Sequence, residues 1–269
     1  MTTQIRYLGI AAYEIVAPGR RVLIDPFLSG SGVAPCREDE LARPDVILIS
    51  HAALDHFGDA ATIALRTGAP VVCGIDSSAL LQERGVPISQ IRTTIWGIQV
   101  EVGGIHVRPV ECHHWASVRL ANGAIVTGSP LAFVVEAEPG VRVYHYGDSA
   151  IFTDMRLIAQ LHEPTVGLLG CTQPKSLLPQ FNAGPGTVLT GEMSADEAAL
   201  AAEFLGVRYA VATHYTDPTD EDVVHFLKMV PRYDTTGSRI GLALRPGEIL
   251  EIDGSSHRIM AAEVSAGAR

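Results

Sequence analysis

Residues 47–59 read Ile-Leu-Ile-Ser-His-Ala-Ala-Leu-Asp-His-Phe-Gly-Asp. The short apolar run from Asp45 to Ile49 is rich in β-branched side chains, which predicts a buried strand. Directly after it come three side chains of the types that bind metal ions: His51, Asp55 and His56. Because α/β folds place their chemistry at the carboxyl ends of strands, we expect a site on this loop. The alternative is a pair of surface histidines beside a helix-capping aspartate.

Length and composition limit the classes of protein to which the chain can belong. With 269 residues and 47% hydrophobic side chains, it can bury a large core, and we expect one domain over residues 1–269. The formal net charge is −10, and Arg20-Arg21 is the only adjacent basic pair. An acidic surface repels phosphate backbones, so nucleic acid is not expected as a partner.

The cysteines and the N-terminus bear on the compartment. The four cysteines are widely spaced and form no C-x-x-C pair, which argues against a zinc ribbon and favours a reducing compartment. The first residues lack the layout of a signal peptide, and no apolar run reaches the ~20 residues that span a bilayer. We therefore expect a cytosolic protein without a membrane partner.

Strand and helix patterns alternate along the rest of the chain, which favours a layered α/β architecture. Helices are predicted over Phe57–Arg66, from Asp76 or Ser77 to Gly85, from a capping box at Ser194 and Glu197 to Gly206, and over Thr219–Met229. A long Gly/Pro-rich loop is expected from Gly170 to Gly186, and loops at 26–43, 115–129 and 170–192 are expected to shape a pocket.

Three further strand ends carry ligand-type residues. His114 follows the apolar segment that ends at Glu111, Asp148 follows a predicted hairpin, and His214 follows the strand over Tyr209–Thr213. An isolated histidine after a strand is more often a hydrogen-bonding residue than a ligand. Imidazole and carboxylate groups that converge from several strands, however, are what Zn²⁺, Mn²⁺ or Fe²⁺ require.

With these motifs the chain resembles the metallo-β-lactamase superfamily, in the branch of small metal-dependent hydrolases similar to ascorbate-6-phosphate lactonase. The resemblance runs from Leu23-Ile24-Asp25-Pro26 to His214-Tyr215. It implies a four-layer αββα sandwich with metals at one edge between two sheets, and a homo-oligomer. It assigns the first metal position to His51 and His114, the second to Asp55, His56 and His214, and a bridging role to Asp148.

One residue departs from the family pattern. The family motif reads His-x-His-x-Asp-His, and here Ala53 stands where the second histidine is expected. Three hypotheses follow: a single ion in the second position, two ions with His113 or water completing the first position, or a degenerate site on a non-catalytic scaffold. We favour the single ion. The choice of His114 over His113 rests on its place before Trp115.

The resemblance implies a hydrolase that uses a metal-bound hydroxide on a small carbonyl substrate such as a lactone, an ester or an amide. Zn or Mn is the expected metal, with Fe as an alternative. We expect Asp55 to orient the water or move its proton, and His51, if it is released from ligation, to act as general acid or base. A small-substrate phosphodiesterase is the alternative enzyme. Asp25 is expected to contact a ligand histidine. His145 is expected to be packed, with a contact to a ligand or to the substrate as the alternative. Trp115 and Tyr215 are expected either to line the substrate or to pack.

Overall fold

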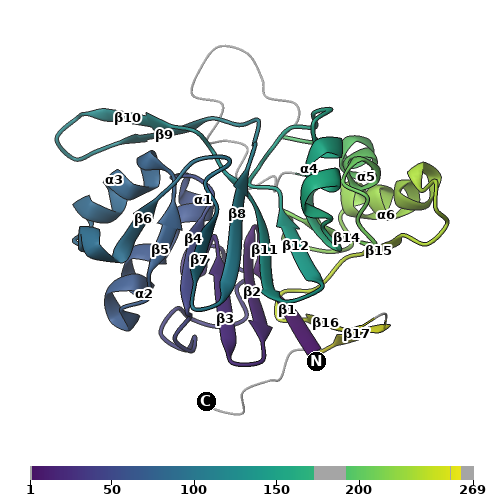
Figure 1. The fold of residues 1–269 in the computed structure, drawn as a ribbon, viewed down its shortest axis with the longest axis horizontal. Coiled ribbons are helices and arrows are strands. Elements are labelled where there is room, and N and C mark those ends of the chain that lie inside the picture. Colours follow the sequence, from purple (N-terminus) through teal and green to yellow (C-terminus); the bar gives the residue numbers. More distant parts are fainter. Residues whose placement is uncertain (1, 173–191, 255, 262–269) are drawn as a thin grey trace.

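Two β-sheets face each other at the centre of the computed structural model, which describes residues 2–172, 192–254 and 256–261 (Figure 1). The first sheet has the order β17-β16-β1-β2-β3-β4-β5-β6. Its strands are β1 (Thr2–Gly9), β2 (Ala12–Ala17), β3 (Arg20–Ile24), β4 (Val46–Ile49), β5 (Val71–Cys73), β6 (Ile91–Thr93), β16 (Ile249–Asp253) and β17 (Ser256–Met260).

The second sheet has the order β15-β14-β13-β12-β11-β8-β7. Its strands are β7 (Val100–Val102), β8 (Ile105–Val110), β11 (Ala132–Glu138), β12 (Val141–His145), β13 (Val166–Gly170), β14 (Tyr209–Thr213) and β15 (Ile240–Leu242). A separate hairpin of β9 (Ala116–Arg119) and β10 (Ile125–Gly128) projects from one side of the structure (Figure 1).

Helices cover the outer faces of both sheets (Figure 1). The first sheet carries α1 (Leu54–Phe57), α2 (Ala60–Thr67) and α3 (Ile75–Glu83), followed by the 3-10 turn η1 (Ile88–Gln90). The second sheet carries α4 (Met155–His162), α5 (Ala195–Phe204) and α6 (Glu221–Tyr233). The order helix, sheet, sheet, helix is the expected four-layer αββα sandwich.

The packing explains why the strands read as continuous apolar runs. All four residues of β4 are buried, because one of its faces packs on the second sheet and the other on α2. Strands β3, β4 and β5 are parallel, and so are β12, β13 and β14, as expected where helices cover the outer face. The core between the sheets includes Tyr7, Tyr13 and Tyr144, all fully buried.

Local details correct several predictions. The helix expected from Phe57 starts earlier, so Asp55 and His56 lie in the single turn α1 and not in a loop. Helix α1 ends at Gly58, where φ is +39°. A Cβ atom at this position would lie 2.5 Å from the Pro26 carbonyl oxygen, so glycine is needed here. Helix α3 begins after Gly74, so Asp76 lies in its first turn and does not cap it. The Asp76 carboxylate instead accepts the Ala52 backbone N–H, which is a tertiary contact.

Some of the remaining elements match their predictions, and others were not predicted from the sequence. The capping box of Ser194 and Glu197 is present at the start of α5. Helix α6 runs over Glu221–Tyr233, longer than expected, while α4, the β9–β10 hairpin and β17 were not predicted. Most of the loop predicted from Gly170 to Gly186 lies outside the described residues. Within the described part of the chain, no helix is both long and apolar enough to span a membrane.

Candidate metal centre

The candidate ligands meet at one edge of the two sheets because their strands end there. His51 follows β4 of the first sheet, whereas His114, Asp148 and His214 follow β8, β12 and β14 of the second. Strand β11 is antiparallel to both β8 and β12, so the carboxyl ends of β8 and β12 share an edge. The parallel strands β13 and β14 extend that edge to His214.

The backbone is strained at this edge. Of the five non-glycine residues with positive φ in the described chain, three lie here: Asp25 (+44°), Asp148 (+66°) and His214 (+68°). Left-handed conformations cost energy in residues with a Cβ atom and persist where the surroundings hold them. Gly147, at φ +59°, precedes Asp148, and a Cβ atom there would lie 2.2 Å from the Leu131 carbonyl oxygen. Glycine is therefore required at this turn.

Two groups of donor atoms are assembled. Asp55, His56, Asp148 and His214 form one, with their donor atoms all within 4.8 Å of one another, and His51, His114 and Asp148 form the other. Asp148 belongs to both groups, as the bridging role requires. The structure therefore brings together all six residues expected from the sequence.

The donor atoms fit a divalent cation. The buried atoms His51 Nε2, Asp148 Oδ1 and His214 Nε2 have no hydrogen-bond partner among the described residues. His214 Nε2 lies 3.5 Å from carboxylate oxygens of both Asp55 and Asp148, which is long for a hydrogen bond. Ligands at about 2.0–2.2 Å from a tetrahedral ion lie roughly 3.3–3.6 Å apart. Two imidazoles and two carboxylates suit Zn²⁺, Mn²⁺ or Fe²⁺.

A second layer of contacts fixes the histidines. Asp25 Oδ2 lies 2.7 Å from His56 Nδ1, so the other ring nitrogen, Nε2, faces Asp148 at 2.8 Å. Ser50 donates its backbone N–H and its hydroxyl to the same Asp25 carboxylate, at 2.8 and 2.7 Å. The Ser50 hydroxyl is also 3.0 Å from His51 Nδ1. Such contacts set the tautomer and ring orientation of a ligand histidine.

Charges within the first group shift its pKa values strongly. Burial alone would lower the pKa of His214, but Asp148 and Asp55 outweigh it and raise that pKa to about 9. Burial alone would raise the pKa of Asp55, but its interactions with His214 and His56 lower it to about 2. Without a metal, protons on the histidines balance the carboxylates, which is the charge a divalent ion would otherwise supply.

The second group is different because Ala53 leaves it one ligand short. Burial and the positive charge of His56 lower the pKa of His51 to about 3, so its imidazole is neutral at pH 7. The ring lies 4.8 Å from that of His114, measured between centroids. A neutral imidazole can ligate a metal, but a group with so low a pKa is a weak base.

We expect Asp25→Asn to weaken metal binding by about 10- to 100-fold, because contacts of this kind usually have that effect. Asparagine tolerates the left-handed backbone of Asp25 and keeps its shape, so the variant mainly removes charge. Competition with a chromogenic chelator measures the affinity. Asp45→Asn is the matched control, since Asp45 also accepts a backbone N–H (from Arg21, 2.7 Å) but touches no ligand. Equal affinities in the two variants would contradict the orienting role.

Metal affinity should rise with pH up to about 9. The metal-free His214 has a pKa of about 9, raised above that of the unfolded chain, so below pH 9 an ion must displace its proton. Each displaced proton gives about a tenfold gain in apparent affinity per pH unit, and His56, whose pKa is also raised, adds to the slope. Calorimetric titration in buffers of different ionisation enthalpy counts the protons released. Binding that is independent of pH would show that these histidines are neutral before the ion arrives.

Three residues near the donor groups belong to neither of them. His113 stays out of both groups: its Nε2 is 2.9 Å from Glu111, and its ring stacks on Phe152. His145 is fully buried, with Nε2 2.9 Å from the Ala11 carbonyl oxygen, as expected of a packed histidine. Trp115 is 61% exposed and stacks on His114, with centroids 4.9 Å apart.

Tyr215, the other aromatic residue considered for the substrate wall, is buried and packs in the core. Its hydroxyl donates to the Leu244 carbonyl oxygen at 2.6 Å.

Reasoning from the sequence did not identify two carboxylates that lie near the site. Glu192 interacts electrostatically with Asp148 and His214, and burial together with the charge of Asp148 raises its pKa to about 7. It follows no strand, so the strand-end argument did not find it. Asp76 is buried and accepts the Ala52 backbone N–H at 2.8 Å, which holds the loop after His51. Its position beside a helix start suggested a cap.

Known proteins share this architecture. Residues 20–215 match the family model for the β-lactamase superfamily domain. A UPF0173 metal-dependent hydrolase from Rubrobacter xylanophilus is 37% identical over 257 residues, which cover 92% of this chain and 96% of that protein. One from Thermococcus onnurineus is 37% identical over 255 residues, covering 93% and 99%.

Among solved structures, Igni18, a metallo hydrolase from Ignicoccus hospitalis, superposes with a TM-score of 0.71. The two sequences are 23% identical, and the match covers 94% of this chain and 99% of the other, which shows a common fold. The range matched by the family model contains every residue of the two donor groups.

Proposed function

This chain belongs to the metallo-β-lactamase superfamily as a metal-dependent hydrolase, and from that premise we propose that it cleaves a small carbonyl compound: a lactone, an ester or an amide. The observation that carries the proposal is the convergence of buried donor atoms without hydrogen-bond partners at the shared edge of the two sheets. We further propose that a single Zn²⁺ or Mn²⁺ ion is held by Asp55, His56, Asp148 and His214.

When bound, such an ion lowers the pKa of a coordinated water towards ~7 and polarises a carbonyl oxygen. The residues of the chain supply the geometry. Asp148 lies between the two groups of donors, and Asp25 fixes the ring of His56. Asp55 is ionised at neutral pH, so it can ligate or accept a hydrogen bond from water, but it cannot donate a proton. His51 presents an unpartnered, neutral Nε2 in the second donor group, which shares Asp148 with the first.

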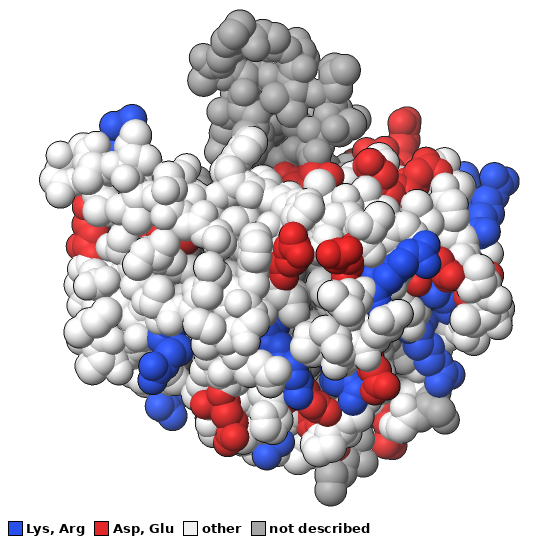
Figure 2. All heavy atoms as spheres, turned by 45° about the horizontal axis from the view of Figure 1, so that its top comes forward, with Lys and Arg blue, Asp and Glu red and all other residues white. Residues whose placement is uncertain are grey.

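The rim of the site supports a substrate with an apolar part. Leu54, next to Asp55, is 64% exposed, and Trp115, next to His114, is 61% exposed. Both side chains adjoin residues of the donor groups, so they offer apolar surface for a substrate to contact at the rim. Figure 2 shows acidic and basic side chains intermixed over the visible face, without a broad basic patch among the residues described. This supports a small-molecule substrate over nucleic acid.

A substrate panel tests the proposal. The protein, reconstituted with Zn²⁺ or Mn²⁺, is assayed on chromogenic lactones, esters, amides and phosphodiesters. We expect turnover of carbonyl substrates that a chelator abolishes and added metal restores. Preference for the phosphodiester would replace the carbonyl substrate by the alternative enzyme class. His51→Ala separates the roles of that residue: unchanged metal content with lost turnover indicates proton transfer, and loss of both indicates ligation.

A further inference from the structure

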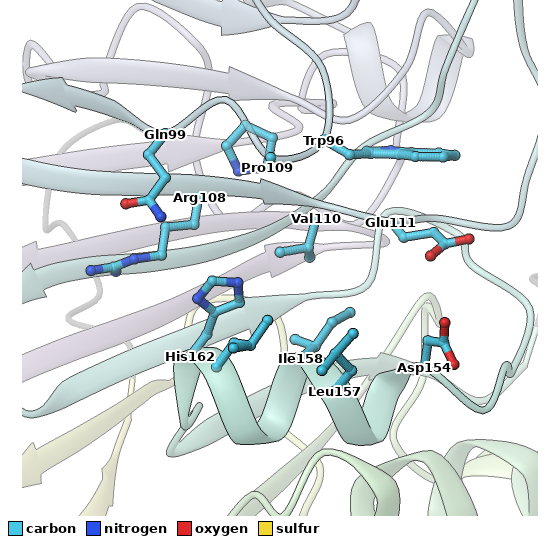
Figure 3. Close-up of a pocket in the computed structure, with 12 residues that line it drawn as sticks. Trp96, Gln99, Arg108, Pro109, Val110, Glu111, Asp154, Leu157, Ile158 and His162 are labelled. Atoms are coloured by element: carbon cyan, nitrogen blue, oxygen red, sulfur yellow. The ribbon is translucent and has the colours of Figure 1, made fainter.

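A cavity lies outside the metal centre, between helix α4 and the segment that joins β6 to β7 (Figure 3). We propose that this cavity, the Trp96 cavity, binds a small carboxylate with an apolar body. Its volume is about 170 Å³. A cavity of roughly 150 Å³ holds a benzene molecule, so the space suits a body the size of one ring.

The walls of the Trp96 cavity are apolar and fixed. In Figure 3 the Trp96 ring lies on one side and Leu157 and Ile158 of α4 lie on the other, with Val110 between them. Trp96 Nε1 donates to the Pro130 carbonyl oxygen at 2.7 Å, which holds the indole in place. Trp96 and Leu157 are 37% and 49% exposed, so burying them against a ligand would stabilise the complex.

The two ends of the cavity carry opposite charge. Arg108 lies at one end beside Gln99 and His162, and Glu111 and Asp154 lie at the other (Figure 3). A carboxylate is attracted to the first end and repelled from the second, so the charges orient it.

Arg108 is only loosely paired. Its Nη1 atom is buried and lies 3.6 Å from Glu136, which is an ion pair but too long for a good hydrogen bond. Glu136 is also 3.8 Å from Arg142 and accepts the Gly140 N–H, so its charge is shared. The other N–H groups of the guanidinium make no strong ion pair with the described residues, so they can donate to a ligand carboxylate at this end of the cavity.

His162 can add a neutral donor. Burial and the charge of Arg108 lower its pKa, so at pH 7 the imidazole is uncharged and offers one N–H. Glu111 and Asp154 are more exposed, and Glu111 already has a partner in His113, 2.9 Å away. The acidic end is therefore hydrated, and the cationic end is the one that gains from a ligand.

Phenylacetate is the probe, with phenylacetamide as its neutral analogue and phenethylamine as its cationic one. The chain has two tryptophans, so in a Trp115→Phe background the fluorescence of Trp96 reports binding alone. We expect a saturable change with phenylacetate at millimolar concentration, and weaker binding of both analogues. Arg108→Met should weaken phenylacetate by about 10- to 100-fold and leave phenylacetamide nearly unchanged, since hydrogen bonds to charged groups have that strength.

The ligand series needs no Arg108 variant, so it tests the cavity even if Arg108→Met fails to fold. Three results overturn the proposal: no saturable change, equal or tighter binding of either analogue, or phenylacetate binding that Arg108→Met leaves intact. Binding at the metal centre would be recognised by its loss on chelation. If a second copy of the chain covers the cavity, Leu161→Glu will lower the sedimentation coefficient and phenylacetate will not bind, which also overturns it.

Discussion

Replacing Asp148 with asparagine should remove the bound ion and lower hydrolysis by about a thousandfold or more. A metal ion supplies several kcal/mol of transition-state stabilisation, and each 1.36 kcal/mol changes the rate about tenfold. Asp148 is the shared member of both donor groups, so its charge stabilises an ion in either position. Asparagine tolerates the left-handed backbone at φ +66°, so the fold should survive.

Metal content by elemental analysis and turnover of the best carbonyl substrate measure the effect together. Asp39→Asn is the control, because Asp39 is an exposed surface aspartate paired with Arg37. An Asp148→Asn protein that keeps its ion and its activity would show that Asp148 is not a ligand. A thermal melt separates loss of the ion from loss of the fold.

Replacing Ala53 with histidine should raise the metal content from about one ion per chain to about two. His51, His114 and Asp148 already place their donor atoms within 4.8 Å of one another. A third imidazole would complete a set of three histidines and a carboxylate, a donor set that suits Zn²⁺. Ala53 is partly exposed and precedes α1 in an extended conformation, so a larger side chain meets little resistance there.

Ala52→His is the matched control for this variant. Ala52 is the neighbouring residue, but successive side chains of an extended segment point in opposite directions, so its imidazole would not reach the same point. A second ion in both variants, or in neither, would contradict the view that the residue at position 53 decides the occupancy of the first metal position.

The sequence predicted which side chains the structure brings together, because one local rule applies to four of the six candidate ligands. His51, His114, Asp148 and His214 all follow apolar strands, and parallel strands bring their carboxyl ends to one edge. The four-layer order of the fold came with the resemblance that these residues carry. The strand that precedes His51 was clear from its composition alone, because both of its faces are buried.

What the sequence did not reveal depends on contacts between distant segments. Glu192 lies two residues before the cap of α5, and its electrostatic interaction with Asp148 depends on the tertiary fold. Helix α4 contains the exposed Leu157 and Leu161, whose outward position depends on how the helix packs. Asp76 was interpreted as a cap, because its contact with the Ala52 backbone is a tertiary one. Contacts of this kind can be identified only in the folded structure.

The central claim is that this hydrolase holds one divalent ion on Asp55, His56, Asp148 and His214. Elemental analysis of protein purified without added metal or chelator tests it most directly, alongside the His214→Ala variant. We predict about one equivalent of Zn or Mn in the natural chain and almost none in the variant, because folded donors bind the ion and a lost ligand releases it. No metal in the natural chain, even after reconstitution, or equal metal in both proteins, would contradict the claim.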